Sequence, residues 1–105
     1  MTPARSTLQA MSADTAAWSA LPGADLLARG LHDLAQGRES PESLLVSIAA
    51  TRLRRLGVDV PPAFDDADLR LYRLLERDDP DAAHGRYNAL LRRLVSFERA
   101  LGCAS

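Results

Sequence analysis

Residues 40–57, SPESLLVSIAATRLRRLG, form the segment with the clearest helix boundaries in the chain. Ser40 is a favoured N-cap residue, and it is followed by proline at the first helical position and by Glu42 in the first turn. Three arginines occupy the last turns, where positive charge offsets the helix dipole, and Gly57 follows them. The sequence therefore predicts one helix between Ser40 and Gly57.

The apolar residues of this segment cover more than half of the helix circumference. They are Leu44, Leu45, Val46, Ile48, Ala49, Ala50, Leu53 and Leu56. A helix that is apolar nearly all round is buried nearly all round. In a chain of 105 residues, it is therefore either the central helix of the fold or part of a subunit interface.

The whole composition favours helix. The chain has eighteen Leu and eighteen Ala, against four Val and one Ile. Unbranched and γ-branched apolar residues lose less rotamer freedom in a helix than β-branched residues do. We therefore predict an all-α fold, in which residues 1–105 form a single compact bundle of four to five helices. Residues 1–6 and 103–105 are expected to be flexible ends.

Helix-breaking residues divide the remainder of the chain. Further helices are expected at 7–20, 24–36, 66–77 and 79–101. Ser12 is an alternative start for the first of them, Asp65 is a candidate cap for the helix at 66–77, and Gly102 ends the last helix. Two antiparallel helical hairpins are expected, one around Gly37 and one around Asp78-Asp79. Residues 58–63 contain two consecutive prolines and predict an extended connection between the pairs.

Gly30 falls within the apolar sector of the second predicted helix. Glycine in a helix interior costs up to ~1 kcal/mol of helix propensity. Close approach of another helix is a reason for glycine at this position.

Charge and cysteine content exclude several classes of protein. Thirteen arginines, no lysine and fourteen acidic residues give a net charge of −1, so the molecule as a whole does not suggest a polyanion partner. Without lysine, no Schiff-base chemistry is available. The arginine-only composition fits either guanidinium chemistry or a compositional bias. Cys103 is the only cysteine and fits a reducing cytosol, so we expect a cytoplasmic protein. No apolar run approaches the ~20 residues of a membrane span, and no signal peptide is expected.

No cofactor or metal is expected. His32 lies on the polar side of its predicted helix, and no Cys, His, Asp or Glu stands around it at a metal-ligand spacing. No Gly-rich phosphate loop and no nucleophile elbow are present.

The leading hypothesis is a non-enzymatic interaction module, because the apolar surface exceeds what a chain of this size hides. The module binds itself, as a homodimer or another homo-oligomer, or binds a partner protein. The predicted interaction residues are Trp18, Leu45, Ile48, Leu53, Tyr87, Phe97 and Glu98. Glu98 falls inside an apolar arc, so its carboxylate requires an arginine from a neighbouring helix or a place at the edge of an interface.

A second hypothesis rests on Arg77, Asp78 and His84. Arg77-Asp78, with His84 seven positions after the arginine, resembles the Arg-polar-x-His motif of HEPN-domain ribonucleases. The resemblance covers eight residues, and Pro80 inside the motif departs from the family's pattern. HEPN ribonucleases are small helical proteins that often dimerise and cut RNA at the dimer interface. The resemblance implies that Arg77 and His84 act on the scissile phosphate and the 2′-hydroxyl.

Two groups of arginines are compatible with phosphate contact. Arg70, Arg73 and Arg77 form a stripe at i, i+3 and i+7, and residues 84–101 carry four arginines against Glu98 alone. Many carboxylates lie close by in sequence, and solvated charge pairs are the alternative interpretation.

Overall fold

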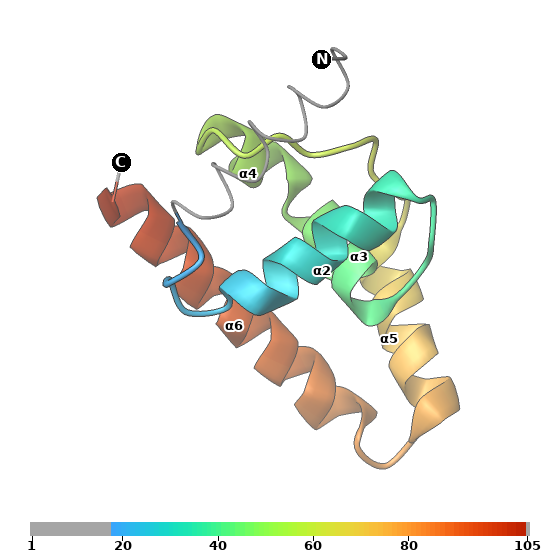
Figure 1. Cartoon of the computed structure of the whole chain (residues 1–105). Coiled ribbons are helices and arrows are strands. Elements are labelled where there is room, and N and C mark those ends of the chain that lie inside the picture. Colours follow the sequence, from blue (N-terminus) through green and yellow to red (C-terminus); the bar gives the residue numbers. More distant parts are fainter. Residues whose placement is uncertain (1–17, 105) are drawn as a thin grey trace.

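The computed structural model describes residues 18–104 and is all-α (Figure 1). Five helices and no strand occur in these residues. The helices are α2 (Ala24–Ala35), α3 (Pro41–Ile48), α4 (Ala50–Arg55), α5 (Ala67–Asp78) and α6 (Ala83–Ala104). The predicted flexible end at 1–6 and most of the predicted helix at 7–20 lie outside the described residues. The predicted fold class is confirmed.

Two helical hairpins make up the fold. α2 packs along α3 after the turn at residues 36–40, and α5 packs along α6 after the turn at residues 79–82. The rings of Tyr72 and Tyr87 meet edge to face across the second pair, with centroids 5.5 Å apart. Figure 1 shows residues 56–66 crossing from the first pair to the second. The two predicted hairpins are confirmed.

α3 packs directly against Gly30 of α2. A Cβ atom built on Gly30 would lie 2.5 Å from the backbone carbonyl oxygen of Glu42 and 2.5 Å from Cγ2 of Val46. Both distances are far below van der Waals contact. The predicted reason for a glycine here, close approach of another helix, is confirmed.

A serine capping box starts α3 and joins it to α2. The Ser40 hydroxyl accepts a hydrogen bond from the Ser43 backbone N–H at 3.1 Å, and the Ser43 hydroxyl accepts one from the Ser40 backbone N–H at 2.8 Å. The Ser40 hydroxyl also donates to the buried Asp33 carboxylate at 2.8 Å. The cap therefore fixes the start of α3 against the end of α2.

The predicted single helix between Ser40 and Gly57 is interrupted at Ala49, which separates α3 from α4. The Ser47 hydroxyl donates to the Ser43 backbone carbonyl at 2.8 Å and accepts a hydrogen bond from the Phe64 backbone N–H at 3.1 Å. A serine bonded back to the preceding turn bends a helix. The interruption at Ala49 comes one residue after Ile48, the neighbour of this serine and the last residue of α3.

Three predicted helix boundaries are wrong by a few residues. The N-cap of α5 is Asp66 rather than Asp65, with a left-handed φ of 52° and no side-chain cap bond. The Asp79 carboxylate accepts hydrogen bonds from two N–H groups of the following turn, and α6 begins only at Ala83. α6 also continues through Gly102, which keeps a negative φ because no turn requires otherwise.

The core lies around α3, which contacts α2, α5 and α6. The largest fully buried apolar side chains are Phe97, Leu27, Leu44, Leu45, Leu53, Leu71, Leu75, Leu94 and Val46. Of the two expected positions for the apolar helix, the structure shows the central one. Helices of the same chain cover this apolar circumference, whereas the outer face of α6 is exposed and is not covered by another helix of the described residues.

Candidate interaction surface

The outer face of α6 carries a shallow depression of about 480 Å³. Its lining residues all come from α6: Asn88, Leu91, Arg92, Val95, Ser96 and Arg99. Val95 is 41% exposed, and among the described residues only Leu69, at 49%, is a more exposed large hydrophobic side chain. The longest helix of the described chain therefore presents an apolar side chain between two arginines to solvent.

A second depression, of about 360 Å³, continues this surface around α6. It shares Arg92 and Ser96 with the first and is closed on one side by Pro22 and Gly23. Gly23 has a φ of 80°, and a Cβ atom there would lie 2.9 Å from the Arg93 carbonyl oxygen. The turn before α2 therefore lies directly on α6 and forms one wall of the surface.

The charges on α6 are unevenly compensated. Arg86 pairs with Asp78, and the Arg93 guanidinium lies 2.9 Å from the Asp25 carboxylate. Neither Arg92 nor Arg99 forms a salt bridge or a hydrogen bond within the described residues. The outer face of α6 therefore keeps two positive charges that have no ionic partner among residues 18–104.

Glu98, the only carboxylate of α6, pairs with an arginine of α4 and forms no salt bridge with Arg92 or Arg99. Its two carboxylate oxygens lie 2.8 Å from Nε and 3.2 Å from Nη2 of Arg52. The hydrogen bond to Glu98 raises the pKa of Arg52 above its ordinary value. On the other side of α6, the hydrogen bond from Arg93 lowers the pKa of Asp25. The arginine expected from a neighbouring helix as the partner of Glu98 is thus present.

The structure places most of the predicted interaction residues inside the chain. Trp18, Leu45, Leu53 and Phe97 are buried in the core, and the Trp18 and Phe97 rings meet edge to face with centroids 5.2 Å apart. Ile48 and Tyr87 are half-buried against the same core. The four core side chains are therefore not available at the surface of the folded chain.

The residues that line the outer face of α6 were missed as an interaction surface. The excess of arginine over carboxylate in residues 84–101 could have indicated this surface, but it was interpreted only as a site of phosphate contact or as solvated charge pairs. Val95 carried a weaker signal, because it lies outside the arc of Leu90, Leu94 and Phe97 that faces the core.

The residues of the ribonuclease-like motif are spread over two helices. Arg77 lies in the last turn of α5, whereas His84 lies in the first turn of α6, after the turn that contains Pro80. His84 Nε2 contacts the Asn88 amide nitrogen at 3.2 Å, and Asp78 pairs with Arg86. Within residues 18–104, no hydrogen bond or salt bridge joins Arg77 to His84.

Arg77 instead belongs to a depression of about 480 Å³ on α5. Its lining residues are Glu39, Arg70, Arg73, Glu76 and Arg77. Arg70 approaches Glu39 at 3.6 Å and lies over the Phe64 ring, whereas Arg73 and Arg77 form no salt bridge within the described part of the chain. The predicted arginine stripe is thus assembled around a shared hollow.

The described residues bring together no group of three or more His, Cys, Asp or Glu that could hold a metal ion. Within residues 18–104, every helix is too short or too polar to cross a membrane. The chain matches no protein-family model, no curated protein and no solved structure.

Proposed function

We propose that this chain is a small cytosolic protein-interaction module whose α6 outer face binds an acidic, partly apolar segment of a partner protein. The observation that carries the proposal is the position of Val95 between Arg92 and Arg99, two arginines without a carboxylate partner in the described structure. The single cysteine supports the cytosolic assignment.

The chemistry of this face defines the partner. Guanidinium groups match carboxylates in both charge and hydrogen-bonding geometry, so acidic side chains are the expected complement of Arg92 and Arg99. The Val95 side chain adds a small apolar contact, and the neighbouring hollows leave room for a side chain of the partner. Because one exposed valine provides little apolar area, we expect weak, salt-sensitive binding with electrostatic steering.

A fluorescent synthetic peptide, helical and with leucine on one face and glutamate on the other, tests the proposal. We expect it to bind the wild-type chain, and Arg92→Gln/Arg99→Gln to weaken binding roughly tenfold or more, which corresponds to about 1.4 kcal/mol. Fluorescence anisotropy at low ionic strength measures both affinities.

The matched control is Arg73→Gln/Arg77→Gln, which removes the same two charges from α5. This variant is expected to bind the peptide like the wild type. Equal weakening by the two pairs of substitutions would overturn the assignment to α6, because the peptide would then be responding only to net charge.

A second candidate function is binding of single-stranded RNA by the arginine stripe of α5. It is favoured by the hollow that Arg70, Arg73 and Arg77 line together with Glu39 and Glu76. Arg70 pairs with Glu39, whereas Arg73 and Arg77 form no salt bridge with a described residue. Arginines that neutralise backbone phosphates bind nucleic acids without reading their sequence. The HEPN resemblance adds a specific role for His84 in cleavage.

An RNA oligonucleotide tests this second candidate. We expect Arg73→Ala/Arg77→Ala to weaken RNA binding. The plot of log affinity against log salt concentration should also become less steep, by the contribution of about two phosphate contacts. His84→Ala should leave binding intact and abolish cleavage. Arg92→Ala/Arg99→Ala serves as the control of equal charge, and equal loss of binding in that variant would contradict a site on α5.

A further inference from the structure

An acidic depression of about 450 Å³ lies where the connection from α4 enters α5. Its lining residues are Ser47, Ile48, Phe64, Asp65, Asp66, Ala67 and Asp68. The Phe64 backbone N–H donates to the Ser47 hydroxyl at 3.1 Å, which fixes this wall of the depression to α3. The half-buried side chains of Ile48 and Phe64 provide its apolar part.

The three aspartates of the depression have no ionic partner in the part of the chain that the structure describes. Asp65, Asp66 and Asp68 are exposed, and none forms a salt bridge with an arginine of the described residues. The nearby Arg70 guanidinium instead approaches Glu39 at 3.6 Å. Asp68 in the first turn of α5 complements the helix dipole, but this role does not require the other two carboxylates.

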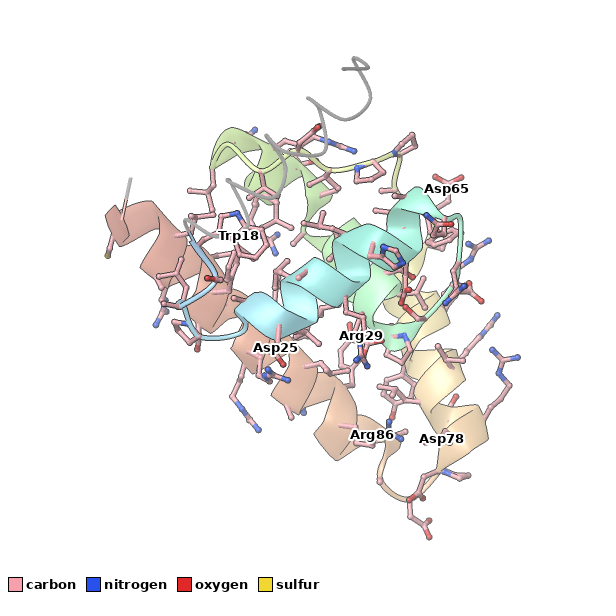
Figure 2. The ribbon with its side chains drawn as sticks, viewed as in Figure 1. Trp18, Asp25, Arg29, Asp65, Asp78 and Arg86 are labelled. Atoms are coloured by element: carbon pink, nitrogen blue, oxygen red, sulfur yellow. The ribbon has the colours of Figure 1, made fainter. Side chains whose placement is uncertain are left out.

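The acidic depression and the outer face of α6 are complementary in chemistry. One combines three unpaired carboxylates with apolar groups, and the other combines two unpaired guanidiniums with Val95. Figure 2 places Asp65 at the start of α5, on the side of the molecule away from α6. The two surfaces share no lining residue and come from different elements of the fold, so one copy can offer each surface to a different neighbour.

We propose that the acidic depression of one copy is the partner that binds the α6 outer face of another, so that the chain associates head to tail. This arrangement rests on the function proposed for the α6 outer face, and it identifies the bound partner as a second copy of the chain. A symmetric contact between two α6 faces is disfavoured, because it would bring Arg92 and Arg99 of both copies together. A head-to-tail contact leaves one free surface at each end, so association continues into short chains or closes into a ring.

Sedimentation at low ionic strength tests this arrangement. We expect the wild-type chain to gain mass with concentration, and this gain to be lost in about 0.5 M salt, where the Debye length is only a few ångströms. Arg92→Gln/Arg99→Gln and Asp65→Asn/Asp68→Asn should each remain monomeric at concentrations where the wild type associates. Asp66 is left unchanged because of its left-handed backbone.

An equimolar mixture of Arg92→Gln/Arg99→Gln and Asp65→Asn/Asp68→Asn tests directly whether the two surfaces bind each other. One variant retains the depression and the other retains the α6 face, so we expect a heterodimer and no larger species. Arg73→Gln/Arg77→Gln should associate like the wild type, and circular dichroism checks that each variant is folded.

Three results would overturn the head-to-tail contact: a wild-type chain that stays monomeric, variants that associate like the wild type, or a mixture that grows beyond the dimer. The peptide experiment is independent of all three. Peptide binding at α6 by a strictly monomeric chain would therefore retain the proposed function and remove only this partner.

Discussion

Replacement of Gly30 by alanine is expected to destabilise the fold by about 1–3 kcal/mol, the usual cost of overpacking a tightly packed core. The new methyl carbon would lie 2.5 Å from the Glu42 carbonyl oxygen. That oxygen belongs to the backbone of α3, so no rotamer change relieves the clash and the two helices must separate. Alanine also gains up to ~1 kcal/mol of helix propensity, which offsets only part of the loss.

Gly85→Ala is the matched control for this prediction. Gly85 lies in α6, and a Cβ atom there would meet no atom within 4 Å. We expect this variant to be neutral or slightly stabilised, because only the propensity gain remains. Urea unfolding, followed by circular dichroism, measures both variants. A stabilised Gly30→Ala variant would show that α2 and α3 do not cross as closely as described.

Phe97→Ala is expected to cost about 3–5 kcal/mol, the usual range for truncating a fully buried aromatic side chain. Phe97 is 0% exposed, and its ring packs edge to face against Trp18. Because domains of this kind are stable by only about 5–15 kcal/mol in total, the substitution removes a large share of the stability. The emission of Trp18 should also shift to longer wavelength as water reaches its ring.

Val95→Ala is the control for Phe97→Ala, because it removes an exposed side chain from the same helix two positions away. We expect it to change the unfolding free energy by less than about 1 kcal/mol, as surface substitutions usually do. Thermal and urea unfolding, monitored by Trp18 fluorescence, give the comparison. Similar losses in the two variants would contradict the orientation of α6 described above.

Local signals in the sequence were sufficient to predict much of the fold. The Ser40 cap, and the left-handed glycines Gly37 and Gly57 after two helix ends, act within a few residues of the backbone that they fix. Gly30 was informative because glycine inside a helix has few physical explanations. These residues can therefore be interpreted from their sequence neighbours alone, without knowledge of how the helices pack.

The interruption at Ala49 and the candidate surface required tertiary information. The interruption follows a hydrogen bond between Ser47 and Phe64, seventeen residues apart. The apolar pattern of α3 is the same for a central helix as for an interface helix, and only the packing of the other helices distinguishes the two. For the same reason, the sequence favoured the buried Phe97 over the exposed Val95 as an interaction residue.

The Ser47 hydroxyl links the interruption between α3 and α4 to the docking of the connection that carries Phe64. It bonds to the carbonyl of its own helix and also receives the amide of the distant connection. We therefore expect the interruption of the helix and the docked connection to form and open together, since both depend on the Ser47 hydroxyl. Local opening of the connection would free the helix to straighten, and the amide of Phe64 should exchange with solvent in step with that opening.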